Sequence, residues 1–198
     1  MTYYTLSDPC AATLEIKKSQ FLGFGIAIDS REQLMFHVEQ LRNQYPDARH
    51  VCYGYIIGDP HNTTSAGFDD DGEPSGTAGR PILNVLQHKG IGNCVVIVVR
   101  YFGGIKLGAG GLTRAYSSTA QAVVDNMNLH AFVPLSVVLI ETDFANESFV
   151  RHTLDGFDAT ILKVDYGKNV VLTVELAQKS VQALSEKIGF YGTVKASE

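Results

Sequence analysis

The segment CVVIVVRY at residues 94–101 is a continuous run of apolar, mostly β-branched residues that ends in Arg100 and Tyr101. A run without polar alternation is typical of a strand that is buried on both faces. We therefore expect it to be the central strand of a sheet that is covered on both sides. The run is also far too short to span a bilayer.

Local signals predict the other elements of this part of the chain. Ser30 followed by Gln33 forms a capping box that begins a helix, and Pro46 disfavours helical geometry at Tyr45 before it. Apolar patterns and turn residues predict two strands within 12–28, a hairpin that starts with a strand at 50–57, a helix from Pro81 to Gly90, and a helix at 112–127.

The pattern restarts at residues 130–134. Beyond them the sequence predicts a strand at 135–142, a helix that ends at Gly156, a strand pair around the turn DYGKN, a helix at 178–188 and a final strand. This βαββαβ order is that of the ferredoxin-like fold. The expected fold class is therefore α+β with two domains, residues 1–132 and residues 133–198.

The loop that leaves the central strand is rich in glycine and flanked by bases. Its glycines are Gly103, Gly104, Gly108, Gly110 and Gly111, and its bases are Arg100, Lys106 and Arg114. A glycine-rich turn between a strand and a helix leaves backbone N–H groups where the helix dipole favours an anion, which predicts a phosphate site. The spacing matches neither the Walker A motif nor the dinucleotide fingerprint. The alternative is that the glycines only permit positive φ and close packing.

The charge distribution favours the phosphate interpretation. The formal net charge of −5 argues against a protein that wraps nucleic acid indiscriminately. Residues 74–124, however, contain no Asp or Glu and retain Arg80, Lys89, Arg100, Lys106 and Arg114. An alternative explanation is that a buried strand and two packed helices have few charges of either sign. That would explain the missing acids but not the retained bases. Any anion site is thus expected to be local.

An acidic loop, DDDGEP at residues 69–74, precedes this segment. Its carboxylates, Asp70 and Glu73 above all, could hold Mg²⁺ against a bound phosphate, although the spacing is not that of a calcium loop. A solvated acidic turn is the alternative.

His50 and Cys52 would lie on the same side of a strand, where they could form a catalytic Cys–His pair. The order of the predicted elements, however, places no oxyanion-hole donor beside them. We instead expect His50 to lie beside the glycine-rich loop or to contact a ligand. The three cysteines show no metal or disulfide spacing and are expected to be reduced.

Four motifs of the first part of the chain are distinctive: YPDARHVCYGY at 45–55, DDGEPSGTAGRP at 70–81, RYFGG at 100–104 and GGLTRAY at 110–116. Together they resemble the motifs of the IMPACT family and its bacterial YigZ-type members. The resemblance implies a first domain like the fourth domain of elongation factor G and the GHMP kinases, and a smaller ferredoxin-like second domain. It also implies a link to translational control. Likeness to a kinase fold does not by itself establish phosphotransfer.

The expected function is that of a cytoplasmic, non-catalytic protein that associates with RNA or the ribosome in regulation of translation or in stress response. The absence of a basic start or apolar run in MTYYTLSDPC supports the expected location and argues against a membrane partner. The alternatives are a Mg²⁺-dependent nucleotide-binding enzyme and a pure protein-interaction module with an unknown partner. The expected RNA- or ribosome-associated function requires no cofactor, whereas the enzyme alternative would use Mg²⁺ with a bound phosphate. The residues expected to bind phosphate or nucleic acid are Arg100, Gly103, Gly104, Lys106, Gly108, Gly110, Gly111, Arg114, His50 and, by stacking, Tyr101.

Overall fold

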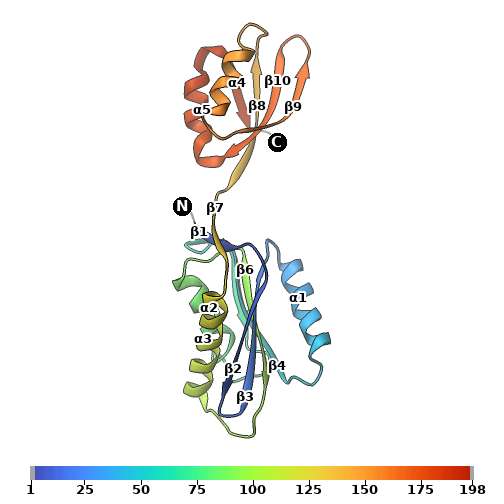
Figure 1. Ribbon diagram of the computed structural model, residues 1–198, viewed down its shortest axis with the longest axis vertical. Helices are drawn as coiled ribbons and strands as arrows, with labels where there is room; N and C mark the ends of the chain where they lie inside the picture. The colour runs from blue at the N-terminus through green and yellow to red at the C-terminus, as the bar shows by residue number, and fades with distance from the viewer. Residues whose placement is uncertain (1–2, 197–198) are drawn as a thin grey trace. The chain divides into compact units, whose positions relative to one another are not determined.

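A computed structural model describes residues 3–196 of the chain, which divides into two compact units between Phe132 and Val133 (Figure 1). The sheets and the buried clusters of each unit lie within that unit alone. The α+β class expected from the sequence is confirmed. No helix within residues 3–196 is long and apolar enough to cross a membrane.

The first unit is built on a five-stranded antiparallel sheet in the order β2-β3-β6-β4-β5. The central strand β6 is the predicted run, and every residue of it but the last is buried. The helix α1 lies on one face of the sheet, and α2 and α3 lie on the other (Figure 1). The bounds are β2 Cys10–Ile16, β3 Ser19–Ala27, α1 Arg31–Gln44, β4 His50–Asp59, β5 Asn62–Asp69, α2 Gly79–His88, β6 Cys94–Tyr101 and α3 Ala109–Asp125.

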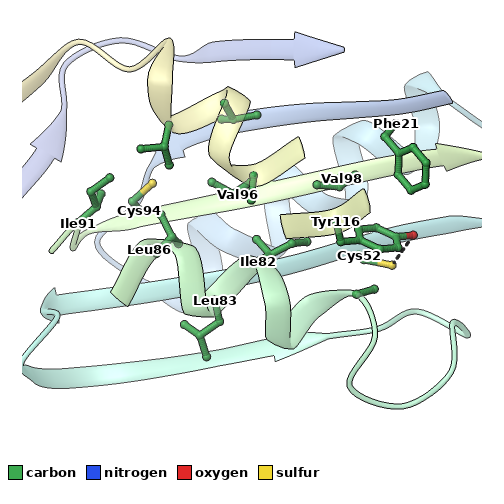
Figure 2. Close-up of a cluster of buried hydrophobic side chains, with 14 of the residues drawn as sticks. Phe21, Cys52, Ile82, Leu83, Leu86, Ile91, Cys94, Val96, Val98 and Tyr116 are labelled. Carbon is green, nitrogen blue, oxygen red and sulfur yellow. Dashed lines mark hydrogen bonds between the residues drawn. The ribbon is translucent and has the colours of Figure 1, made fainter. Parts of the chain in front are cut away.

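Alternate side chains of β6 supply two separate cores. Val95, Ile97 and Val99 belong to the cluster beneath α1. Val96 and Val98 belong to the cluster beneath α2 and α3, shown in Figure 2. Because side chains alternate along a strand, Arg100 at the end of β6 points to the side of α3 and Tyr101 to the side of α1.

The predicted helix signals are confirmed for α1. The Ser30 hydroxyl accepts a hydrogen bond from the N–H of Gln33, and the Gln33 side chain accepts one from the N–H of Asp29. The helix ends at Gln44, just before Tyr45 and Pro46. By contrast, α3 begins at Ala109, three residues before the predicted start, because the glycines at the end of the loop are already helical.

Two short strands were not predicted. β1 Tyr3–Leu6 pairs antiparallel with β7 Leu129–Phe132, and the Tyr3 and Phe132 rings stack 4.8 Å apart. The partners come from opposite ends of the unit, so no local turn signals their pairing.

The second unit has the predicted βαββαβ order, and its sheet order, β11-β8-β10-β9, is that of the ferredoxin-like fold. Both α-helices cover one face of the sheet (Figure 1). Short 3₁₀ turns, η1 Gln178–Ser180 and η2 Gly189–Tyr191, flank the last helix. The bounds are β8 Leu135–Thr142, α4 Glu147–Asp155, β9 Thr160–Tyr166, β10 Val170–Ala177, α5 Val181–Ile188 and β11 Thr193–Ala196.

Candidate anion-binding site

A pocket of about 370 Å³ lies where the glycine-rich loop meets the start of β4. Five segments of the first unit form it: the start of β4, the acidic loop after β5, the end of β6, the glycine-rich loop and the start of α3. We call it the glycine-loop pocket. It is lined by Arg49, His50, Glu73, Pro74, Arg100, Phe102, Lys106, Leu107, Gly108, Ala109 and Leu112.

The N-terminus of α3 opens at this pocket without a side-chain cap. Gly108 is the N-cap residue, and its φ of 71° explains why glycine stands there. The Gly108 carbonyl oxygen accepts the first hydrogen bond of the helix, from the N–H of Leu112. Within residues 3–196, the N–H groups of Ala109, Gly110 and Gly111 have no acceptor. Such a helix end attracts an anion through its free donors and its dipole.

Arg100 lies at the inner side of the pocket and is almost completely buried, with 7% of its side chain exposed. Its guanidinium forms an ion pair with the Glu73 carboxylate. Its Nε is a buried nitrogen for which residues 3–196 offer no hydrogen-bond partner. The Phe21 and Phe102 rings lie 5.4 Å and 5.8 Å from its Cζ. The sequence predicted Arg100 as a charge partner for phosphate. Its charge is balanced by Glu73, and its Nε is the part of the guanidinium that remains without a partner.

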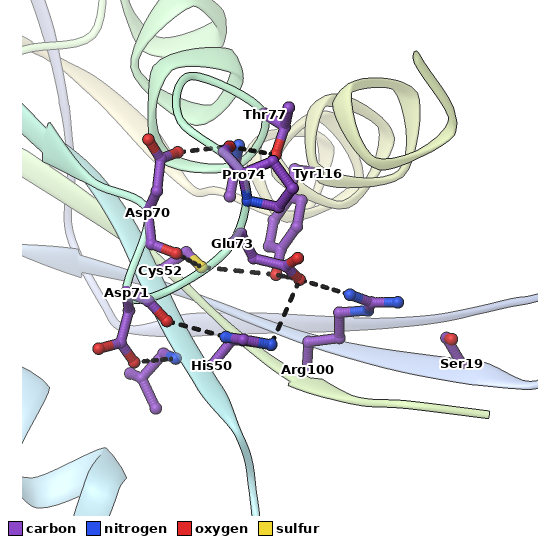
Figure 3. A network of polar contacts seen from close by, with 12 residues as sticks. Ser19, His50, Cys52, Asp70, Asp71, Glu73, Pro74, Thr77, Arg100 and Tyr116 are labelled. Atoms are coloured by element: carbon purple, nitrogen blue, oxygen red, sulfur yellow. Dashed lines mark hydrogen bonds and ion pairs between the residues drawn. The ribbon is translucent and has the colours of Figure 1, made fainter. Parts of the chain in front are cut away.

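Glu73 is the centre of a polar network (Figure 3). Besides the Arg100 ion pair, its Oε1 accepts a hydrogen bond of 2.9 Å from the Tyr116 hydroxyl. The Nδ1 of His50 donates to the Asp71 carbonyl oxygen at 2.8 Å, which leaves its Nε2 on the side of Glu73, 4.0 Å from Oε1. His50 therefore lies beside the loop, in the position expected, and lines the pocket.

The acidic loop does not present its carboxylates to a metal. The two oxygens of Asp70 accept backbone hydrogen bonds from Gly76, Ala78 and Gly79, which hold the turn before α2. Glu73 is committed to Arg100 and Tyr116. In the part of the chain that the structure describes, no group of three or more His, Cys, Asp or Glu side chains is arranged to hold a metal ion. The residues present do not fit the Mg²⁺ site considered from the sequence.

The other predicted residues separate into three places. Lys106 is exposed and lines the glycine-loop pocket. Arg114 lines a neighbouring pocket of about 240 Å³ together with Lys17, and Leu107 lines both pockets. Tyr101 packs against the core beneath α1, on the opposite face of the sheet, and is not among the residues that line this pocket, so its stacking on a base stays a prediction.

The glycines of the loop also differ in their roles. A Cβ on Gly103 would come within 1.9 Å of the Lys18 carbonyl carbon, so this glycine permits the loop to pass over the β2–β3 turn. Its N–H donates to the buried Ser19 hydroxyl, and it therefore serves packing and not a ligand. Gly104 has a φ of 85°, and Gly108 forms the helix start described above. A Cβ on Gly110 would meet open space.

Sequence reasoning missed two bases near these pockets. Arg49 is exposed and lines the glycine-loop pocket, and Lys17 lines the neighbouring one. A signal for Arg49 was present, since it lies within the motif YPDARHVCYGY and directly precedes His50. Lys17 lies in the turn between β2 and β3, and only the tertiary fold brings it close to α3.

Cys52 is not an activated nucleophile. It is fully buried, its single S–H donates to the Asp70 carbonyl oxygen 3.0 Å away, and the Tyr116 hydroxyl oxygen lies 3.4 Å from its Sγ. Burial raises the pKa of the Cys52 thiol and, likewise, that of Cys94. A raised pKa leaves little of the reactive thiolate at neutral pH.

We therefore expect iodoacetamide at pH 8 to leave Cys52 and Cys94 unmodified in the folded protein, and to modify them when urea unfolds it. Mass spectrometry of the digested protein measures this directly. Rapid labelling of Cys52 in the folded state would contradict the structural role given to it.

Comparison with known proteins assigns both units. The Impact N-terminal domain matches residues 17–124, and a domain of unknown function (DUF1949) matches residues 140–189. The chain is 36% identical over 180 residues to the IMPACT family member YigZ of Escherichia coli strain K12, covering 91% of this chain and 88% of that protein.

Other relatives support the same assignment. The IMPACT family member YvyE of Bacillus subtilis strain 168 is 29% identical over 185 residues, covering 93% of this chain and 84% of its own length. A crystal structure of a hypothetical protein has 32% sequence identity and a TM-score of 0.72, with 100% of this chain and 98% of that chain covered. On these matches, and on the two-unit fold that carries them, the chain belongs to the IMPACT family.

Proposed function

We propose that this chain is a non-catalytic, cytoplasmic RNA-binding protein that acts on or near the ribosome in regulation of translation or in stress response. The observation that carries the proposal is the uncapped N-terminus of α3, which opens at a pocket beside the exposed bases Arg49 and Lys106. The translational part of the proposal comes from the family, whose members are linked to translational control.

The arrangement of charge supports an extended phosphate ligand. The glycine-loop pocket contains Arg49 and Lys106, the neighbouring pocket contains Lys17 and Arg114, and the side chain of Leu107 is common to both. Two adjacent basic sites can hold two phosphates of one strand. Contacts to phosphate supply most of the sequence-independent affinity for nucleic acid.

A Mg²⁺-dependent enzyme gains no support from the same site. Asp70 is hydrogen-bonded to backbone N–H groups, and Glu73 is paired with a buried arginine. Neither carboxylate is available for a metal ion that bridges to phosphate oxygens.

Substitution of both exposed loop bases tests the proposal. We expect Lys106→Ala with Arg114→Ala to weaken binding of single-stranded RNA. The slope of log K against log salt concentration should become shallower by about 1.4, because each lost phosphate contact changes it by about 0.7. Fluorescence anisotropy across a salt series measures both quantities, and thermal unfolding should change little because both side chains are exposed.

A matched control removes the same charge elsewhere. Lys168→Ala with Lys179→Ala changes two exposed lysines of the second unit and should leave affinity and slope close to those of the parent. If the two double variants lost RNA affinity equally, the loss would be due to net charge alone, and the proposed RNA site would be wrong.

A further inference from the structure

We propose that the glycine-loop pocket binds the phosphomonoester group of a nucleotide, so that the chain prefers a phosphorylated RNA end to an internal phosphodiester. The inference deepens the proposed RNA-binding function and rests on it for the source of the nucleotide. It begins from two independent features of the pocket, the free N–H groups of α3 and the unpartnered Nε of Arg100.

Arg100 is more than nine-tenths buried and is fixed in orientation by its ion pair with Glu73. A buried N–H without an acceptor is costly, because the donor has lost water and gained no partner. A phosphate oxygen bound beside Arg100 would supply that acceptor. Nε is enclosed, so this contact requires neighbouring side chains to move.

The charge of the pocket fits a dianion. Arg100 and Glu73 balance each other, so Arg49, Lys106 and the positive end of α3 remain to attract a ligand. A phosphomonoester carries a charge of about −1.5 to −2 at pH 7, whereas an internal phosphodiester carries one negative charge. Two bases and a helix N-terminus therefore match the terminal group better.

The size and lining of the pocket also favour the terminal nucleotide of an RNA strand over an internal one. Its volume of about 370 Å³ is at the low end of the range for small-molecule sites. It accommodates one nucleotide-sized group and not a stretch of strand. The exposed ring of Phe102 at the rim can stack on the terminal base. The next phosphate would then reach the neighbouring pocket of Lys17 and Arg114.

The test compares single-stranded RNA decamers of one sequence that carry a 5′-phosphate, a 3′-phosphate or only hydroxyl ends. We expect one of the phosphorylated decamers to bind about tenfold more tightly than the hydroxyl form, which is the gain that about one additional charge-assisted hydrogen bond would give. Fluorescence anisotropy at fixed salt gives the ratio. Adenosine monophosphate should compete with the phosphorylated decamer, and inorganic phosphate should compete more weakly.

Ala109→Glu removes the preference without threatening the fold. Ala109 is exposed in the first turn of α3, where a carboxylate stabilises the helix but repels a phosphate. We expect the tenfold ratio to fall to near one. Gln40→Glu, an equal charge change at an exposed position of α1, should keep it. Arg100→Lys keeps the charge beside Glu73 but removes the Nε donor, and it should reduce the ratio in protein that thermal unfolding shows to be folded.

The outcomes separate this inference from the proposed function. Equal affinity for all three decamers would overturn the inference and leave RNA binding in place. Binding of adenosine monophosphate without binding of any RNA would support the pocket chemistry, with a free nucleotide as its source, and would overturn the RNA function. Binding of neither would overturn both, and an unchanged ratio in Ala109→Glu would overturn the placement of the phosphate.

Discussion

Glu73→Gln is expected to lower the free energy of unfolding by about 3–5 kcal/mol. The Glu73 side chain is 4% exposed, and its carboxylate pairs with the equally buried guanidinium of Arg100 while accepting the Tyr116 hydroxyl. Gln keeps the shape and still accepts a hydrogen bond, but it leaves a positive charge buried without a counter-ion. The cost is that of the unpaired charge, which is much larger than the net contribution of the pair.

Urea unfolding measures this loss, and two further variants identify its cause. Glu39→Gln removes a carboxylate from the exposed side of α1 and should change stability by less than about 0.5 kcal/mol. Glu73→Gln with Arg100→Met removes both charges and should recover much of the stability lost by the single substitution. If Glu73→Gln cost less than about 1 kcal/mol, the pair would behave as a surface ion pair and the buried network would be wrong.

This expectation changes how any test of the acidic loop must be interpreted. Asp70 and Glu73 are the two carboxylates that a magnesium hypothesis would neutralise first. Asp70 holds three backbone N–H groups and Glu73 holds Arg100, so their loss affects the fold before it affects a ligand. A drop in nucleotide turnover in such a variant would not identify a catalytic metal unless the variant were shown to be folded.

Local patterns predicted most of the fold. Each of three signals predicts the element in which it lies from a few adjacent residues. They are the β-branched run of β6, the capping box at Ser30 and the alternating strands of the second unit. The pairing of β1 with β7 could not be read in this way, because it joins segments more than a hundred residues apart. Tertiary contacts of this kind leave no local periodicity.

The candidate site was predicted only in part. His50, Lys106 and Gly108 line one pocket, whereas Gly111 and Arg114 line another. Tyr101 faces the opposite core. The position of Tyr101 follows from alternation, since adjacent residues on a strand cannot share a face. The neutralisation of Arg100 could not be predicted, because its partner Glu73 comes from a loop whose path depends on the whole fold.

The two interpretations of the glycine-rich loop apply to different glycines. Gly103 is required by packing against the β2–β3 turn, and Gly108 gives α3 an uncapped start that faces the pocket. The same loop therefore packs closely over the β2–β3 turn at one end and leads into an uncapped helix N-terminus at the other. The geometric and ligand-binding hypotheses need not exclude each other once they are assigned residue by residue.

Gly103→Ala is expected to cost about 3 kcal/mol or more, because the new methyl group would overlap the Lys18 backbone and neither chain segment can yield without moving a strand end. Gly110→Ala is the matched control in the same loop. Gly110 lies in the first turn of α3 with open space around its Cα, so alanine should raise stability by roughly 0.5–1 kcal/mol through its better helix propensity. Urea unfolding of the two variants should thus give shifts of opposite sign. Similar small effects from both would mean that the loop passes the β2–β3 turn at a greater distance, and the structural role assigned to Gly103 would be wrong.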